Sequence, residues 1–439
     1  MTDLLKDTID QLATPVQTEL PQETGVGLVG GLQPSDGSIP PTPVIPGPPS
    51  FSIVLIAKDE AKSLPNLLKS LEEFKARGGE TLLVDTGSTD DTVKIAEDWG
   101  VIVEKVGPKF IHKLDALKAK EINDTFIVRG EEPIVVEGDS YFDFGEARAY
   151  AMMKAKNDYV CCPGCDEVFT TLNLDKVEEY IAKGYTQMRV DYIWSRTSDG
   201  QPDRRFYRDA YLFNRKKWHW VGCIHETVVE NVAPEKWIEL PTNVVLVNHY
   251  QIHQASRTNR DLVGLAISCL NEPDNDRHAH YFARELMFKK RYRSAVQQFM
   301  RHADLNKWDL ERGQSLTFIG DCYQYLKQEG RAIDWYNESI KFCAARREPL
   351  IRLALIYYNK RDFQRTAIYA QAVLTIPYIP FYANQLDHYR HLPHELLYWA
   401  LYYLGDKEGA KYHWSKCMEY MPTNEKFLSD KKFFVPEEK

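Results

Sequence analysis

Hydrophobic and polar positions divide the chain into a tail, a segment of alternating strands and helices, and a segment of helices alone. Residues 51–57 (FSIVLIA) form a short apolar run rich in β-branched side chains, as expected for a strand buried on both faces. Residues 63–74 place leucines at helical spacing, and residues 80–92 predict a second strand that ends in a hydroxyl-rich, acidic loop. A helix that ends at Gly100 and a third strand at 101–106 follow. This alternation predicts a parallel sheet with right-handed crossovers.

The two polar loops, after Ala57 and after Val84, should meet at the carboxyl edge of that sheet, where ligands bind in such folds. Residues 107–140 interrupt the pattern and read as an insertion. Residues 142–156 then predict a helix, and residues 158–169 a strand that runs into an acidic turn. Mixed strands and loops continue to about His249.

The third segment is helical and weakly repetitive. Alanines open the second helix of each predicted pair at intervals of 37, 35 and 43 residues; they are Ala295, Ala332, Ala367 and Ala410. This spacing resembles that of tetratricopeptide repeats, whose stacked helix pairs present a concave face. A plain helical bundle is the alternative.

The pattern therefore predicts three parts: a tail at 1–50, an α/β domain at 51–255 and a helical domain at 256–439. The tail combines a short amphipathic stub, 4–12, with nine prolines between Pro15 and Pro49, which cannot build a core. No apolar run is long enough to cross a membrane, and no secretory signal is visible, so we expect a cytoplasmic protein.

Charge is distributed unevenly. Residues 277–439 contain 26 Lys and Arg against 19 Asp and Glu, whereas the rest of the chain contains 29 against 44. An acidic first half suits a site that gathers a divalent metal, and a basic helical half is compatible with an anionic acceptor. A solvated helical surface explains the basic half equally well. Cys161, Cys162 and Cys165 cluster, but no second Cys/His pair completes a zinc pattern.

The motif VDTGSTDDT, residues 84–92, carries the clearest chemistry. Asp85 ends a buried strand and can accept hydrogen bonds from a base or ribose, and Gly87 permits close backbone approach. Ser88 and Thr89 suit the same site, but they also suit a helix N-cap.

Five motifs together resemble family 2 glycosyltransferases of the GT-A fold. They are IVLIAKDEAKSLPNLLKSL, LLVDTGSTDDTVKIAEDWG, DFGEARAYAM, GCDEVF and WVGCIHETV, in that order between residues 51 and 250. In particular, the chain is similar to the bacterial and phage subgroup with a C-terminal tetratricopeptide-like region. The resemblance implies a GT-A, Rossmann-like α/β domain followed by an all-α domain.

The resemblance also implies a UDP-sugar donor site. Asp85 matches the family's uracil- or ribose-contacting acid, with Ser88 in the same loop, and Ala57 and Glu60 lie in the preceding nucleotide loop. Arg148 matches the position where the family often places an arginine near the diphosphate, for which a guanidinium is well suited. A surface ion pair is the alternative for Arg148.

The family's acidic metal motif is usually Asp-x-Asp, and here it reads Gly164, Cys165, Asp166. The first aspartate is missing, so the resemblance leaves Asp166 to hold Mn²⁺ or Mg²⁺ beside the donor and Cys165 to line the donor site. His249 lies where related folds bring a histidine to the metal, and His253 follows four residues later.

The motif WVGCIHETV resembles the subgroup's Gly-x-x-His-Glu signature. Direct displacement needs a base for the acceptor's proton. We expect Glu226 to be that base, with His225 as a metal ligand, phosphate contact or alternative base. Arg204 and Arg205 fit phosphate or acceptor contacts, or salt bridges.

The sequence thus predicts an inverting, metal-assisted hexosyltransferase that uses a UDP-sugar. Its acceptor could be a surface glycan, a protein or peptide, or a modified DNA base, although no motif for reading bases is present. A homodimer is compatible with the exposed repeats. The alternatives are a pseudo-glycosyltransferase that acts as a repeat-based binding module and, with less support, a nucleotidyltransferase.

Overall fold

The computed structural model describes residues 47–196, 200, 202–232, 234–250 and 259–434. The predicted stub at 4–12, most of the proline-rich tail and His253 lie outside these residues. Residues 48–439 form one compact unit, in which the strands end at His249 and the described helices resume at Asn259. The predicted domain boundaries at 50 and 255 stay predictions.

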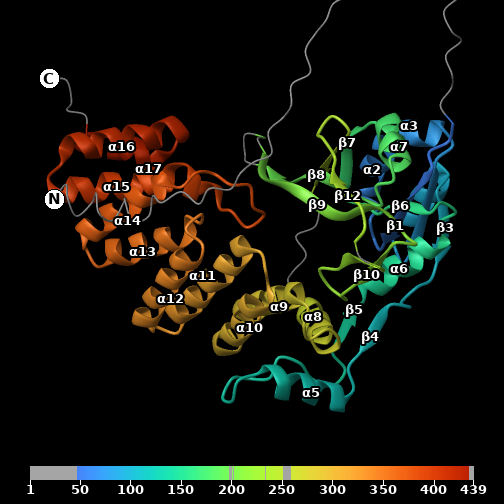
Figure 1. The fold of residues 1–439 in the computed structure, drawn as a ribbon, viewed down its shortest axis with the longest axis horizontal. Coiled ribbons are helices and arrows are strands. Elements are labelled where there is room, and N and C mark those ends of the chain that lie inside the picture. Colours follow the sequence, from blue (N-terminus) through green and yellow to red (C-terminus); the bar gives the residue numbers. More distant parts are fainter. Residues whose placement is uncertain (1–46, 197–199, 201, 233, 251–258, 435–439) are drawn as a thin grey trace, which may run out of the picture. The chain divides into compact units, whose positions relative to one another are not determined.

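The α/β part contains a nine-stranded sheet in the order β3-β2-β1-β6-β9-β8-β13-β7, with β12 beside β8 (Figure 1). Its strands are β1 Phe51–Ala57, β2 Glu80–Asp85, β3 Ile102–Lys105, β6 Tyr159–Cys161, β7 Glu167–Leu172, β8 Gln187–Arg196, β9 Pro202–Asn214, β12 Trp237–Glu239 and β13 Val245–His249. Its helices are α2 Leu64–Ser70, α3 Glu72–Ala76, α4 Thr92–Trp99, α6 Phe144–Lys154 and α7 Leu174–Ala182.

The strands β3, β2, β1 and β6 are parallel, as the alternating pattern predicts. Beyond them the sheet is mixed, because β9 is antiparallel to both β6 and β8. The register pairs Ala57 with Asp85, so the two polar loops do leave the sheet at the same edge.

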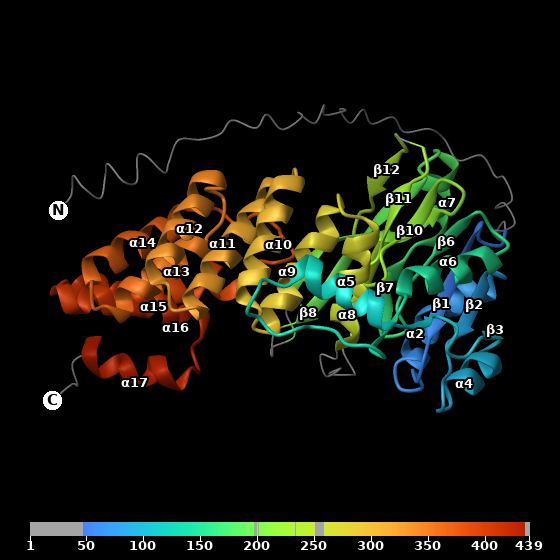
Figure 2. The same cartoon turned by 90° about the horizontal axis from the view of Figure 1, so that it is seen from below.

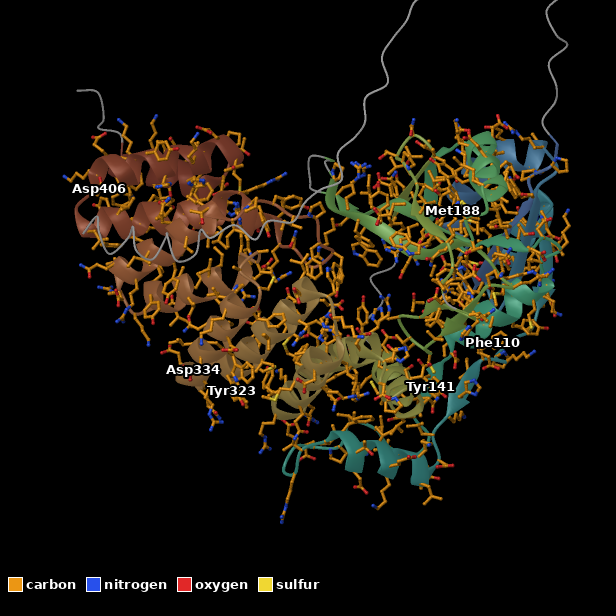
Figure 3. The ribbon with its side chains drawn as sticks, in the orientation of Figure 1. Phe110, Tyr141, Met188, Tyr323, Asp334 and Asp406 are labelled. Atoms are coloured by element: carbon orange, nitrogen blue, oxygen red, sulfur yellow. The ribbon has the colours of Figure 1, made fainter. Side chains whose placement is uncertain are left out.

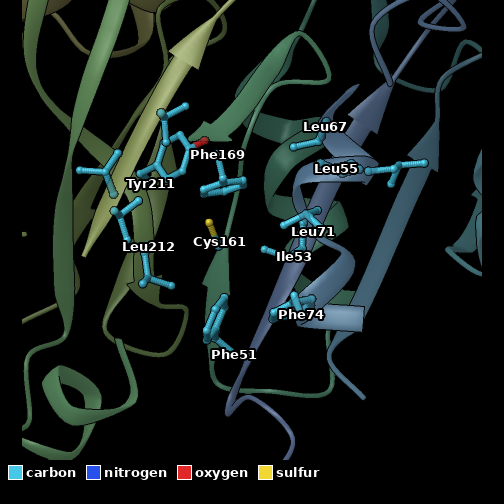
Figure 4. Close-up of a cluster of buried hydrophobic side chains, with 14 of the residues drawn as sticks. Phe51, Ile53, Leu55, Leu67, Leu71, Phe74, Cys161, Phe169, Tyr211 and Leu212 are labelled. Atoms are coloured by element: carbon cyan, nitrogen blue, oxygen red, sulfur yellow. The ribbon is translucent and has the colours of Figure 1, made fainter. Parts of the chain in front are cut away.

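Strand β1 is buried on both faces, as its continuous apolar run predicts. Phe51, Ile53 and Leu55 share one core cluster with the leucines of α2 and with Phe74 of α3 (Figure 4). Val54 belongs to a second cluster on the opposite face, which includes alanines of α6. The helix predicted at 63–74 is divided at Leu71, where the backbone leaves helical geometry.

The predicted insertion contains β4 Ile111–Lys113, helix α5 Ala116–Phe126 and the start of β5 Ser140–Phe142. The strands β4 and β5 pair with each other as a separate two-stranded ribbon. A second ribbon consists of β10 Trp218–Val221 and β11 Thr227–Glu230. Figure 2 shows α5 beside α8, and side chains of both helices share one core cluster.

The remaining elements are helices. They are α8 Asn259–Asn271, α9 Asp276–Phe288, α10 Tyr292–Leu305, α11 Asp309–Tyr325, α12 Glu329–Phe342, α13 Glu348–Asn359, α14 Phe363–Thr375, the 3₁₀ turn η1 Leu386–Tyr389, α15 His391–Leu404, α16 Lys407–Tyr420 and α17 Glu425–Phe434. No described helix combines the length and the apolar character needed to span a membrane.

The predicted second helices are α10, α12, α14 and α16, and each contains its alanine near the first turn. Ala295, Ala332 and Ala410 are fully buried, because each packs where neighbouring helices approach closely. Figure 3 shows the side chains of this region, including Tyr323 on α11 and Asp334 on α12. The fold is therefore an α/β domain followed by a tetratricopeptide-like helical region, as predicted.

Candidate functional site

The two polar loops at the sheet edge are braced against each other. The Asp59 amide donates to the Ser88 hydroxyl at 3.0 Å, and the Thr89 amide donates to the Asp59 carboxylate at 2.7 Å. The Glu60 amide donates to the Thr92 hydroxyl at 2.6 Å. Asp59 takes a left-handed backbone conformation, with φ of 57°. Ser88 and Thr92 thus use their hydroxyls to fix the shape of the first loop.

The Asp85 side chain is buried at the end of β2. Its carboxylate accepts hydrogen bonds from the amides of Gly87 and Ser88, at 3.2 and 3.1 Å. These bonds hold the glycine-containing turn, where Gly87 has φ of 107°. Contact of Asp85 with a base or ribose stays a prediction.

A cleft of about 820 Å³ opens beside the first loop. Ala57 and Glu60 line it, together with Lys58 of the same loop. The opposite wall comes from residues 138–144 and includes Tyr141 and Phe144. Sequence reasoning missed this wall because the insertion gave no motif; the aromatic run YFDF was the available signal. The volume is typical of a small-molecule site.

Cys165 and Asp166 lie in the turn between β6 and β7. The Cys165 thiol is buried and lies 3.6 Å from the Ile56 carbonyl, which ties this turn to β1. The Asp166 carboxylate lies 3.0 Å from Nε2 of His249, at the end of β13. The His249 ring stacks on Trp194, with centroids 4.4 Å apart. The structure therefore brings together the two residues expected to hold a metal.

Asp166 and His249 each shift the pKa of the other. Burial acts to raise the pKa of Asp166, but the hydrogen bond and charge of His249 outweigh it and lower that pKa below its usual value. Burial acts to lower the pKa of His249, but Asp166 outweighs it and raises that pKa. Asp166 is thus held as a carboxylate that is about one-third exposed.

Glu167, the next residue, matches the end of the acidic motif, but the sequence gave it no role. Its carboxylate is buried, accepts a hydrogen bond from the Tyr192 hydroxyl at 2.9 Å and forms an ion pair with Arg208. Its second oxygen, Oε2, is buried without a hydrogen-bond partner among the described residues. A Cβ atom added at Gly164 would lie 2.9 Å from an oxygen of Asp166, so the turn is packed around a glycine.

Arg148 and Glu226 form an ion pair. Nε of Arg148, on α6, lies 2.6 Å from the Glu226 carboxylate, and both side chains are about one-tenth exposed. The guanidinium also lies over the Trp220 ring and 3.5 Å from the Cys162 carbonyl. The expected phosphate ligand and the expected base are therefore partners in this structure, next to the β6–β7 turn.

His225 lies apart from the Asp166–His249 pair. Its ring stacks on Tyr281 of α9, with centroids 3.9 Å apart, and its backbone has φ of 55°. The ring keeps contact with solvent, but surrounding protein and the charges of Arg277 and Arg284 hold its pKa below the usual value. Among the described residues, no ion pair or hydrogen bond joins the His225 ring to another side chain.

Of the two arginines predicted in β9, Arg205 forms an ion pair with Asp191, with nitrogen-to-oxygen distances of 2.5 and 2.8 Å. Its guanidinium also donates to the Thr242 hydroxyl at 3.0 Å. The salt-bridge alternative therefore describes Arg205 in this structure.

A group of side chains that could hold a metal ion lies around the start of α6. His112, Asp143 and Glu146 place one possible ligand atom each within 4.8 Å of the others. Asp143 is the N-cap of α6, and its carboxylate lies 3.1 Å from the Cys223 thiol. Among the described residues this group is a candidate place for a cation that the sequence did not suggest, in addition to the expected Asp166–His249 pair.

One segment of the chain matches the model of a known family. The model of the family described as Glycosyl transferase family 2 matches residues 52–112, which run from β1 to the start of β4. This segment includes both braced loops. The match supports a glycosyltransferase domain in the α/β part, and members of this family often use divalent metals. No curated protein matches the chain.

Solved structures similar to this chain match over its helices. PilF of Pseudomonas aeruginosa is 13% identical, over 38% of this chain and 71% of its own, with a TM-score of 0.32. The MamA protein is 11% identical, over 40% and 86%, with a TM-score of 0.30. YrrB, described as a TPR protein with an unusual peptide-binding site, is 14% identical, over 39% and 82%, with a TM-score of 0.30. Similarity with such low identities and TM-scores gives no information about function.

Proposed function

We propose that this protein transfers a hexose from a UDP-sugar to a nucleophilic acceptor, with inversion and with help from Mn²⁺ or Mg²⁺. One observation carries the proposal. The Asp166–His249 pair and the Arg148–Glu226 pair lie at the same sheet edge as the loops of the segment that matches glycosyltransferase family 2. The turn that holds Asp166 is tied through Cys165 to Ile56, which lines the nucleotide-sized cleft.

The donor fits the cleft beside residues 57–60. Its braced loop presents Lys58 and backbone groups on one wall, and Tyr141 and Phe144 on the other. Aromatic rings suit the face of a uracil, and a lysine suits an anionic phosphate. Because Asp85 already fixes the turn at Gly87, we propose that a donor meets this turn without rebuilding it.

Asp166 and His249 would hold the cation. The pair offers a carboxylate and an imidazole 3.0 Å apart, a donor set that suits Mn²⁺ and is acceptable for Mg²⁺. One residue away, Oε2 of Glu167 is a further buried carboxylate oxygen of the same turn that has no hydrogen-bond partner among the described residues. When bound, the cation would neutralise the diphosphate leaving group. Trp194, stacked on His249, fixes the orientation of the imidazole.

Arg148 and Glu226 supply the remaining roles. While Arg148 is paired with Glu226, the guanidinium occupies the carboxylate that would accept the proton. A diphosphate competes for the same guanidinium. We propose that donor binding draws Arg148 away and leaves Glu226 free to accept the acceptor's proton. Proton removal is then coupled to the presence of the donor.

The acceptor is open between a surface glycan, a protein or peptide, and a modified DNA base. We favour an anionic or polymeric acceptor, since residues 277–439 have more basic than acidic side chains. A homodimer stays a prediction. The alternative function is a binding module without turnover. It is supported by Gly164, because this glycine replaces the first aspartate of the family's metal motif.

A donor screen tests the proposal. UDP release from a panel of UDP-hexoses would be measured with Mn²⁺, with Mg²⁺ and with a chelator. We expect turnover that needs the cation, and a loss of about a hundredfold or more in Glu226→Gln, as for removal of a general base. Asp166→Ala should weaken the dependence on metal. Asp98→Ala, which removes an exposed aspartate on α4, is the matched control and should behave as wild type.

Two results would contradict the proposal. Absence of both turnover and UDP binding would exclude the transferase reading. UDP binding without turnover for any donor, with or without metal, would favour the binding module. If Asp166→Ala left the rate and its metal dependence unchanged, the metal assignment would be wrong.

A further inference from the structure

The loop that carries Glu226 is held from behind by helices of the C-terminal part. This loop, residues 222–226, connects β10 to β11. Gly222 has φ of 84°, and a Cβ atom there would collide with the His278 ring of α9. The next amide, of Cys223, donates to the Ser268 hydroxyl of α8 at 2.9 Å. The loop therefore approaches both helices at backbone distance.

The following two residues continue these contacts. Ile224 is buried against Gly264 of α8, where an added Cβ atom would lie 2.5 Å from the isoleucine side chain. His225 stacks on Tyr281, and its carbonyl accepts a hydrogen bond from Nε of Arg277 at 3.0 Å. Each of the four residues before Glu226 thus has its own contact on α8 or α9.

The other side of the loop rests on the start of α6, the helix that carries Arg148. The Phe144 amide donates to the Cys223 carbonyl at 2.9 Å. A side chain at Gly145 would collide with the Gly222 carbonyl, so the two backbones are in close contact. The loop is therefore clamped between α6 and the pair α8–α9, and Glu226 emerges from the clamp facing Arg148.

The conformation of His225 has an energetic cost. A non-glycine residue in the left-handed region costs on the order of 1–2 kcal/mol, so it persists only where contacts impose it. The contacts here are the Tyr281 ring and the Arg277 guanidinium, whose charge also lies 5.2 Å from the Tyr281 ring centre. Because Glu226 is the next residue, the turn at His225 sets the direction in which its side chain leaves the backbone.

We propose that Tyr281 and Arg277 are positioning residues for the transfer reaction. They hold the left-handed turn at His225 and thereby keep Glu226 against Arg148. The helices α8 and α9 would then form part of the catalytic site. This inference rests on the proposed function, in which Glu226 is the base. With Tyr281 and Arg277 as positioning residues, α9 affects the rate of proton removal and does not bind the donor.

The test compares Tyr281→Ala with Tyr281→Phe in the full chain. The alanine variant loses the stack, whereas the phenylalanine variant keeps it. We expect Tyr281→Ala to lower kcat for UDP release by about tenfold to a hundredfold, with the donor KM nearly unchanged, because a misplaced catalytic group loses rate and not donor contacts. Tyr281→Phe should retain wild-type kcat. Arg277→Gln should lower kcat in the same way.

The matched control is Tyr325→Ala. Tyr325 of α11 also stacks on a neighbouring tyrosine, Tyr292, but lies away from the loop and is more than half exposed. Its loss should leave kcat unchanged. Equal kcat in Tyr281→Ala and wild type, an equal loss in Tyr281→Phe, or a change confined to the donor KM would each overturn the inference.

Hydrogen exchange separates this inference from the proposed function. In Tyr281→Ala, the amides of residues 223–227 should exchange faster than in wild type, and those of β1 should not change. This readout needs no donor. Absence of turnover in the wild type would remove the proposed function, and faster exchange would still show that α9 holds the loop. Unchanged exchange in Tyr281→Ala would overturn the clamp itself.

Discussion

Three acidic side chains in and beside the β6–β7 turn are each matched with a basic partner. The pairs are Asp166 with His249, Glu167 with Arg208, and Glu226 with Arg148. An unpaired buried carboxylate is costly, so this matching lets the site fold without a bound cation. Gly164 keeps the number of acidic and basic side chains equal, because an aspartate there would add a carboxylate without a basic partner.

Restoring that carboxylate is a direct test of the balance. In Gly164→Asp, the new Cβ would lie 2.9 Å from Asp166 and 3.2 Å from Glu167. We expect the free energy of unfolding to fall by about 1–3 kcal/mol without metal, from crowding and like-charge repulsion. Mn²⁺ should recover much of this loss, since a third carboxylate strengthens the cation site.

Urea unfolding with Mn²⁺ and with a chelator would measure both effects. Gly164→Asn is the control, because it has nearly the same size without the charge, and it should lose stability in a way that Mn²⁺ does not reverse. A Gly164→Asp variant as stable as wild type in the chelator, or unresponsive to Mn²⁺, would contradict the prediction.

At the residue scale, the sequence named single positions, and it named a contacting pair only where the family resemblance supplied one. Asp166 and His249 are 83 positions apart, and their contact followed from the family pattern. The Arg148–Glu226 pair was not foreseen, although both residues were named. Nothing in either motif states that β10 and β11 bring that loop onto α6. Tyr281 was missed because its role exists only through a stacking partner.

At the scale of elements, sequence patterns predicted those strands and helices whose formation depends on residues close together in the chain. Apolar runs predicted β1 and β2, and the spacing of four alanines predicted α10, α12, α14 and α16. The order β9-β8-β13-β7 was not predicted, because antiparallel pairing between distant segments has no periodic signature. Helix α5 was also missed, and its residues pack on helices far along the chain.

Two histidines that contact each other between α15 and α16 predict a pH-dependent stability. Nδ1 of His394 on α15 lies 2.8 Å from Nδ1 of His413 on α16, so one ring must donate and the other accept. Burial lowers the pKa of His413 to about 4, helped by His394, and burial with the charge of Lys416 lowers the pKa of His394. Glu419 and Asp406 oppose these shifts only in part.

The sign of the effect follows from these directions. In the unfolded chain the histidines bind protons near pH 6.5, whereas in the folded chain they bind them at lower pH. The unfolded state therefore holds more protons in between, and stability falls as the pH drops from about 6.5 towards 4. The loss for His413 should reach up to about 3 kcal/mol.

Equilibrium unfolding at a series of pH values, followed by hydrogen exchange in α15 and α16, would check this. His413→Gln keeps a hydrogen-bonding side chain that cannot be protonated, and its stability should depend less on pH in this window. A pH dependence identical to that of the wild type would show that the pair does not titrate as predicted.

At the scale of the whole molecule, the segment at 107–140 connects the α/β part to the helical part. Phe126 of α5 packs edge-on against Phe282 of α9, with ring centres 4.9 Å apart. Glu131 accepts hydrogen bonds from the amides of Arg293 and Ser294 at the start of α10. Ile224, next to the candidate base, belongs to the same core cluster. The insertion and the loop at 222–226 share this core with the helices, so we expect the described residues from 48 to 434 to unfold together.

Phe126→Ala tests this cooperativity. The substitution removes a buried ring from the shared core and should lower the free energy of unfolding by about 3–5 kcal/mol. Because the core is shared, amides of β1 and of α11 should lose the same amount of protection against exchange through global unfolding. Both elements lie far from residue 126 in the sequence. Leu117→Ala, on the exposed face of the same helix, should change neither. If only α11 lost protection, the helical part would unfold by itself, and the catalytic loop would lose its support from α9 before the sheet unfolded.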